Sequence, residues 1–144
     1  VEGFDLLAVF RRVHAALRPG GLFLCDMNTA YALETYWDEG TYVTDTPEIT
    51  VIMASRHDYV RHRSTVQVTC FERAGELYRK IQETHVEQAY PSEHVSTLLT
   101  DAGLKVEASY ACFSTEAPDE STPRVFWVAR RPGGAMMSRG QAQA

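Results

Sequence analysis

The segment ALRPGGLFLCDMNT, residues 16–29, predicts the fold of the chain. Apolar residues at helical spacing precede it, and Asp5 can cap the first turn of that helix. The Pro-Gly-Gly turn at residues 19–21 ends the helix. Leu22–Cys25 is an uninterrupted apolar run, which is typical of a strand covered on both faces of a parallel sheet. We therefore expect the helix–strand half of a βαβ unit.

The residues after this strand predict a small antiparallel sheet. Ala30–Trp37 can form a short helix, and a loop follows it, marked by Gly40 and Pro47. Three strand-like runs separated by short turns come next, and such turns are typical of a meander. The runs are Ile49–Asp58, Thr65–Arg73 and Leu77–Val86.

A helix and two strands are expected to complete the domain. The helix follows Pro91 and ends at Gly103. Leu104–Cys112 and Val125–Ala129 then predict an antiparallel pair of strands joined by a polar loop. Residues 133–144 are rich in Gly, Ser and Gln, and we expect a flexible tail there.

Composition favours one globular domain in the cytoplasm. The chain has 144 residues, of which 44% are hydrophobic and 23% charged. Its three cysteines lie in apolar runs without the spacing of a zinc site, so we expect reduced thiols, no metal and a cytoplasmic location. No apolar run approaches the roughly 20 residues that cross a bilayer, so no membrane partner is expected.

The charge of the chain argues against nucleic acid as a partner. The formal net charge is −5, whereas proteins that bind nucleic acid usually carry clustered positive charge. A local basic cluster is interpreted as a solvated turn and consists of Arg56, His57, Arg61, His62 and Arg63.

Four segments, in this order, resemble the C-terminal half of class I S-adenosylmethionine-dependent methyltransferases. They are LRPGGLFLCDMNT (17–29), ETHVEQAY (83–90), LLTDAGLKV (98–106) and PRVFWVARR (123–131). The second segment is similar to the end of an antiparallel insertion found in a small-molecule subgroup of that family. The resemblance implies an α/β fold, with a partial Rossmann-like methyltransferase sheet and a three-stranded antiparallel β insertion. The expected domain covers residues 1–132, with the insertion at residues 48–90 binding the acceptor.

The sequence departs from that family where the cofactor would bind. Family members begin with a strand and a glycine-rich turn that receives the cofactor, and no such turn occurs here. We therefore expect a fragment, or a remnant completed by a partner chain. The resemblance implies S-adenosylmethionine as the donor of the complete enzyme, and the isolated chain is expected to be inactive. Its cofactor-binding residues stay unknown.

Candidate substrate-binding residues follow the predicted strand at residues 22–25. Open α/β sheets bind ligands beyond the carboxyl ends of their strands, where Asp26 and Asn28 lie and where Tyr31 and Trp37 follow. Arg124 begins the last strand and can pair with a carboxylate there. Each has a plainer alternative: Asp26 can cap a turn, the aromatic residues can pack the insertion, and Arg124 can be solvated.

Candidate catalytic residues lie on the third strand of the predicted insertion. Alternation places Glu83 and His85 on one face with Leu77 and Ile81. Histidine has an unperturbed pKa of about 6.5 and suits the general base that an amine or hydroxyl acceptor requires. A structural, hydrogen-bonded histidine is the alternative.

Two classes of function follow from these observations. The first is the acceptor-binding part of a methyltransferase acting on a small molecule. The second is a non-catalytic dimerisation or interaction module derived from that fold. A nicotinamide dehydrogenase fragment fits less well, because nothing here resembles a hydride-transfer site. The strand at residues 22–25 needs neighbours on both edges, so the expected partner is a second copy of the chain or a missing N-terminal half.

Overall fold

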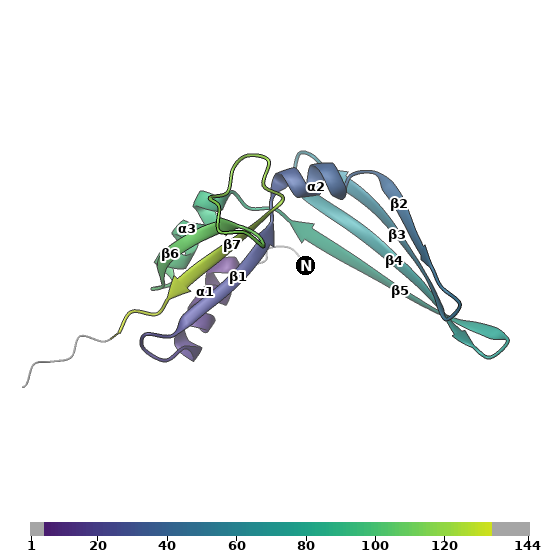
Figure 1. Ribbon diagram of the computed structural model, residues 1–144, viewed down its shortest axis with the longest axis horizontal. Coiled ribbons are helices and arrows are strands. Elements are labelled where there is room, and N and C mark those ends of the chain that lie inside the picture. Colours follow the sequence, from purple (N-terminus) through teal and green to yellow (C-terminus); the bar gives the residue numbers. More distant parts are fainter. Residues whose placement is uncertain (1–4, 134–144) are drawn as a thin grey trace, which may run out of the picture. The chain divides into compact units, whose positions relative to one another are not determined.

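The computed structural model describes residues 5–133 and contains two sheets (Figure 1). The first is three-stranded in the order β1-β7-β6, and the second is four-stranded in the order β2-β3-β4-β5. The chain divides into two compact units, which are described separately. The first comprises residues up to Cys25, Glu93–Ser109 and residues from Trp127 onward, and the second comprises Asp26–Ser92 and Tyr110–Phe126.

Helices α1 (Leu6–Ala16) and α3 (Ser92–Asp101) pack in the first unit, as the apolar spacing predicts. The Asp5 carboxylate accepts a hydrogen bond from the Ala8 backbone N–H at 3.0 Å and caps α1. The Phe10 ring of α1 contacts Phe23 edge to face, with centroids 6.0 Å apart.

Strands β1 (Leu22–Asn28), β6 (Lys105–Ala111) and β7 (Arg124–Arg130) form the first sheet. Backbone bonds from Thr29 to Pro123 and from Arg131 to Gly21 make β1 and β7 antiparallel. Trp127 and Ala129 of β7 are buried, and Trp127 donates to Ser96 of α3 at 3.3 Å.

The outward face of β1 differs from the expectation of cover on both faces. Leu22 and Leu24 are 45% and 54% exposed, because among residues 5–133 the helices α1 and α3 cover only the face that carries Phe23 and Trp127.

The second unit contains an antiparallel meander of four strands. They are β2 (Gly40–Asp45), β3 (Ile49–Asp58), β4 (Arg63–Ala74) and β5 (Leu77–Gln88). The register pairs Tyr42 with Met53, Met53 with Val68, and Val68 with Glu83. Strands β3, β4 and β5 confirm the three strands that the sequence predicts between residues 49 and 86.

The expected number of three strands is wrong, because the segment interpreted as a loop after Gly40 forms β2. Among residues 5–133 this strand pairs on one side only, with β3, and its side chains are almost all exposed. It therefore lacks the apolar alternation that marks a strand in a sequence.

Helix α2 (Ala30–Tyr36) and the ends of β3 and β4 supply buried residues of the second unit. Leu33 is fully buried and Val66 is 2% exposed. The Thr29 hydroxyl accepts from the Ala32 backbone N–H at 3.2 Å and so caps α2. The expected tail at residues 133–144 lies, apart from Gly133, outside the described residues.

Candidate functional site

Three of the predicted substrate-binding residues meet where β1 ends and β7 begins. Arg124 Nη1 lies 3.1 Å from Asp26 Oδ2, and Arg124 Nε donates to Asn28 Oδ1 at 3.1 Å. The antiparallel pairing of β1 with β7 places these side chains on one face of the sheet. Both members of the ion pair are partly exposed, with 44% of the Arg124 side chain and 39% of the Asp26 side chain accessible, so a ligand can reach them.

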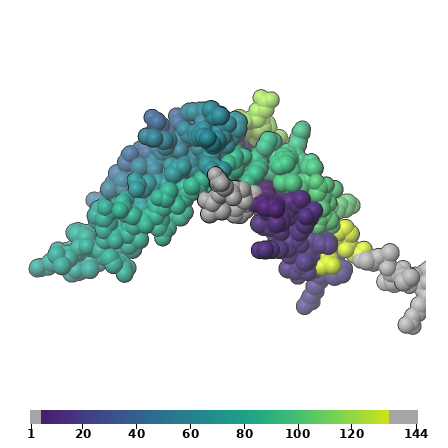
Figure 2. Space-filling model, turned by 180° about the vertical axis from the view of Figure 1, so that it is seen from behind, coloured from purple at the N-terminus to yellow at the C-terminus, as the bar shows by residue number. Residues whose placement is uncertain are grey.

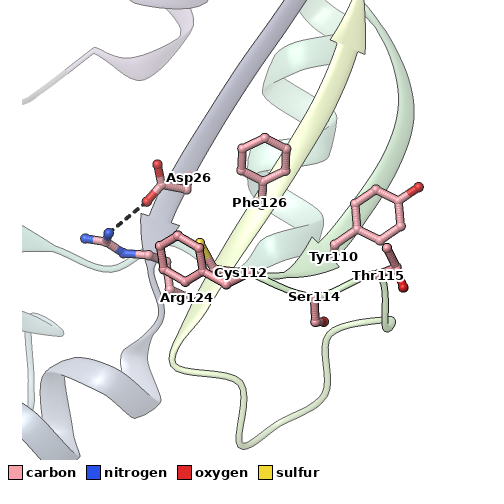
Figure 3. Close-up of a pocket in the computed structure, with 8 residues that line it drawn as sticks. Asp26, Tyr110, Cys112, Ser114, Thr115, Arg124 and Phe126 are labelled. Carbon is pink, nitrogen blue, oxygen red and sulfur yellow. Dashed lines mark ion pairs between the residues drawn. The ribbon is translucent and has the colours of Figure 1, made fainter.

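A cavity of about 740 Å³ adjoins this ion pair, and all its lining residues belong to the second unit (Figure 3). Phe126 of β7 and Tyr110 of β6 supply aromatic surface (Figure 3). Phe113 and three small polar side chains complete the lining. The three are Cys112, Ser114 and Thr115. A cavity of this size, with a few polar groups on largely apolar walls, is typical of small-molecule sites.

Phe113 has an unusual conformation in the loop that lines this cavity. Its φ of 64° lies in the left-handed region, and its side chain is 98% exposed. The Ser114 backbone N–H donates to the Ala111 carbonyl at 3.0 Å, and the Ala111 N–H donates to the Glu116 carbonyl at 2.9 Å. These bonds hold a tight turn after β6 that directs an aromatic ring into solvent.

A second cavity, of about 330 Å³, lies within the second unit and includes Tyr31. Its lining also contains His62 and Asp119. His62 Nδ1 lies 3.6 Å from Glu34 Oε1, and Asp119 accepts hydrogen bonds from the loop that precedes β7. The hydrogen bonds from Ser121 and Thr122 hold the pKa of the Asp119 carboxyl below its ordinary value.

The other aromatic candidate does not join Tyr31 at either of these cavities. Tyr31 contacts Tyr36 edge to face, with ring centroids 6.3 Å apart. Trp37 is half-buried at the C-cap of α2 and lines neither cavity.

Glu83 and His85 lie together on β5, apart from both cavities. His85 Nε2 is 3.1 Å from Glu83 Oε2, and the two side chains are 54% and 63% exposed. The register places them beside Val66 and Val68 of β4, and the teal strand β5 lies at the surface in Figure 2. Their catalytic role stays a prediction.

Sequence reasoning did not single out six lining residues of the larger cavity, all from the ends of β6 and β7 and the loop between them. The backbone bond from Cys112 N to the Arg124 carbonyl, 2.8 Å long, brings these ends side by side. Placing the two predicted strands in register from Arg124 would have identified Tyr110 and Phe126. Phe113, Ser114 and Thr115 gave no such signal, because a turn rather than an alternating strand positions them.

Residues 5–133 contain no group of three or more His, Cys, Asp or Glu side chains placed to hold a metal ion. None of the helices described there has the length and apolar character needed to cross a bilayer.

In comparisons with known proteins, this chain is similar to methyltransferases. No family model matches the chain. A protein of Geobacillus sp. strain WCH70, which carries the provisional name of a methyltransferase, is 27% identical over 132 residues. YqeM of Bacillus subtilis strain 168, with the same provisional name, is 23% identical over 127 residues. These matches cover 91% and 88% of this chain but 53% and 51% of the relatives, so the chain spans about half of their length.

Solved structures that are similar to the chain include methyltransferases. An S-adenosylmethionine-dependent methyltransferase from Clostridium acetobutylicum ATCC 824 has a TM-score of 0.78 and 25% identity, covering 90% of this chain and 52% of that one. CalS10 of Micromonospora echinaspora, an amino pentose methyltransferase with bound S-adenosylmethionine, has a TM-score of 0.54 and 17% identity, covering 87% of this chain and 50% of that one. The mixed α/β architecture with antiparallel sheets therefore matches methyltransferase folds.

Proposed function

We propose that this chain is the acceptor-binding part of an S-adenosylmethionine-dependent methyltransferase that acts on a small molecule. One observation carries the proposal: Asp26 and Arg124, two of the residues that the sequence predicts to bind substrate, line a cavity of about 740 Å³ in a chain that matches about half of such an enzyme. We also propose that the chain corresponds to the C-terminal half of such an enzyme, that the insertion at residues 48–90 binds the acceptor, and that the protein is cytoplasmic.

The cavity supplies groups that methyl transfer to a small acceptor requires. Methyl transfer from a sulfonium is an in-line displacement, so the enzyme must hold acceptor and donor in alignment. The Asp26–Arg124 pair and the aromatic walls can orient an acceptor, and a carboxylate can accept the proton that an amine or hydroxyl releases. His85, with Glu83, is the alternative proton acceptor that the sequence predicts.

The proposed donor site lies in residues that this chain does not contain. Its sequence has no glycine-rich turn of the kind that receives the cofactor in the family. We expect calorimetric titration of the 144-residue chain with S-adenosylhomocysteine to give no heat of binding. Joining the chain to the half of the Geobacillus relative that it does not cover is expected to restore binding and methyl transfer.

Two outcomes of that experiment would contradict the proposal. Binding of S-adenosylhomocysteine by the chain alone would place the donor site within these residues. A joined protein that binds S-adenosylhomocysteine but methylates no acceptor from an amine and hydroxyl library would favour the interaction module. In an active joined protein, Asp26→Asn and His85→Asn compare the two proton acceptors, and the greater loss of kcat identifies the base.

The interaction module is the second candidate because both sheets present open edges. Among residues 5–133, β1 has a strand on one side only, and so does β5, whose residues from Leu77 to Val86 are exposed. An exposed edge of this length is a template for pairing with another chain.

A further inference from the structure

We propose that the Asp26–Arg124 pair binds the two opposite charges of an aromatic amino acid or a similar aromatic zwitterion. This inference rests on the proposed function of the larger cavity as the acceptor site. It names the class of acceptor: a ring for the aromatic walls, a carboxylate for Arg124 and an ammonium group for Asp26.

The guanidinium of Arg124 is held in one orientation by two neighbouring side chains, and its terminal nitrogens remain available to a ligand. Nε donates to Asn28 Oδ1 at 3.1 Å, and Nη1 faces Asp26 Oδ2 at the same distance. Within residues 5–133, Nη2 donates no hydrogen bond to the protein. A carboxylate is planar and accepts two parallel N–H bonds from a guanidinium, so the terminal nitrogens suit such a ligand.

Asp26 makes the site suited to a zwitterion rather than to an anion alone. The lining of the cavity contains one acidic and one basic side chain, Asp26 and Arg124, so the site is close to neutral. An isolated anion on Arg124 would be repelled by the Asp26 carboxylate, and an isolated cation on Asp26 would be repelled by Arg124. A ligand with both charges on neighbouring atoms satisfies both partners.

The walls of the cavity favour an aromatic group on this ligand. Phe126 and Tyr110 are half-buried, and Figure 3 shows Phe126 between the ion pair and Tyr110. Aromatic rings stack or meet edge to face with a gain beyond simple burial. The volume of about 740 Å³ accommodates a molecule the size of phenylalanine.

The methyl acceptor would then be the amine that faces Asp26. An ammonium group loses a proton to the carboxylate, and the freed nitrogen lone pair attacks the methyl carbon of S-adenosylmethionine. The carbon–sulfur bond breaks, and its electron pair stays on sulfur as S-adenosylhomocysteine. The secondary ammonium that forms carries the positive charge that the sulfonium loses, so atoms and charge balance.

Four probes test this on the 144-residue chain without any methyl donor. L-Phenylalanine has both charges and a ring, 3-phenylpropanoate has only the anion, phenethylamine has only the cation, and L-alanine has no aromatic ring. Binding is followed by ¹H–¹⁵N NMR titration. We expect L-phenylalanine to bind about tenfold more tightly than each of the others, with shifts at the ends of β1, β6 and β7.

Charge variants assign each ligand group to its residue. Arg124→Gln is expected to weaken L-phenylalanine and 3-phenylpropanoate about tenfold and to strengthen phenethylamine, because the guanidinium that repels this cation is removed. Asp26→Asn is expected to weaken L-phenylalanine and phenethylamine and to strengthen 3-phenylpropanoate, because the carboxylate that repels this anion is removed. The matched control is the Arg79–Glu72 pair of β4 and β5, whose variants Arg79→Gln and Glu72→Gln should bind all probes unchanged.

Folding defects are separated from loss of binding by a conservative variant. Arg124→Lys keeps the charge but loses the planar pair of donors, so it should fold as the original chain does and recover only part of the affinity. Equal binding of all probes, or variants without the expected selectivity, would overturn the inference. The absence of L-phenylalanine binding would also overturn it. The proposed function is tested separately, by methyl transfer to any small acceptor in the joined enzyme.

Discussion

His57 and Ser64 form a buried polar pair at the facing ends of β3 and β4. His57 is 6% exposed and Ser64 is fully buried, and His57 Nδ1 lies 2.8 Å from Ser64 Oγ. The assignment of His57 to a solvated basic turn is therefore wrong. The sequence places His57 among charged neighbours, whereas strand alternation turns its side chain inward and that of Arg56 outward.

We predict that Ser64→Ala lowers the free energy of unfolding by about 1 to 3 kcal/mol. His57 Nε2 has no partner among the described residues, so losing Ser64 leaves both ring nitrogens buried and unpaired. Urea unfolding followed by fluorescence measures the change. Thr65→Ala, at the exposed next position, is the control and should have little effect.

The double variant His57→Phe with Ser64→Ala checks the cause. It removes both polar partners and keeps much of the volume, so it should be more stable than Ser64→Ala alone. A double variant that is the least stable of the set would show that shape, rather than hydrogen bonding, determines the effect.

Asp119 organises the loop that leads into β7, and its contribution should depend on pH. Its carboxylate accepts from Ser121 Oγ at 2.9 Å and from Thr122 Oγ1 at 3.0 Å, and these bonds hold the pKa of Asp119 below its ordinary value. Because the pKa is lowered on folding, the stabilisation is present above the ordinary value and is lost as pH falls through the folded pKa. We therefore predict that Asp119→Ala is less stable than the original chain at pH 7 and that the difference shrinks below about pH 4.

Thermal unfolding at a series of pH values measures this difference. Glu120→Ala is the neighbouring control, because Glu120 is exposed. A difference between Asp119→Ala and the original chain that stayed constant down to pH 2 would contradict the role assigned to the ionised carboxylate.

At the scale of elements, Thr29 connects α2 to the loop before β7. Its hydroxyl accepts from the Ala32 N–H at 3.2 Å and donates to the Thr122 carbonyl at 2.8 Å. We predict that Thr29→Val destabilises the chain by about 1 kcal/mol, the usual cost of losing an N-cap. Urea unfolding measures this cost, and Thr29→Ser should recover most of it. If valine and serine behaved alike, the hydroxyl would have no capping role.

The elements with strong periodicity were predictable from the sequence, and the rest lacked a local signal. Phe10 of α1 and Leu99 of α3 each belong to a row of apolar residues at helical spacing, and both are buried. The sequence therefore predicts both helices. The sequence does not predict strand β2, because this segment lacks apolar alternation and is a strand through its pairing with β3. Tyr42 and Val43 of β2 are 55% and 60% exposed.

The candidate site shows the same division. Asp26 and Asn28 could be chosen because they follow an apolar run, and Arg124 because it opens the last strand. Their meeting depends on β7 lying next to β1, a pairing of residues about a hundred positions apart that local sequence does not encode. Glu83 and His85 are neighbours as alternation predicts, yet their exposure depends on which elements cover β5.

At the scale of the molecule, the first sheet ends in an uncovered strand. Among residues 5–133, β1 pairs only with β7, and its outward Leu22 and Leu24 are 45% and 54% exposed. Apolar side chains and unpaired backbone groups at one edge favour association with another chain. The expectation of a homo-oligomer is therefore kept as a proposal for the 144-residue chain.

We predict that the chain self-associates and that Leu24→Lys weakens this association. A lysine on β1 puts a charge on the apolar surface that a second copy would cover, and charged side chains are a common means of blocking sheet edges. Sedimentation velocity over a range of concentrations measures the effect. Val60→Lys is the matched control, because Val60 is 89% exposed in the turn between β3 and β4, outside either sheet. A monodisperse monomer at all concentrations would contradict the prediction, and equal effects of the two lysines would place the association elsewhere than β1.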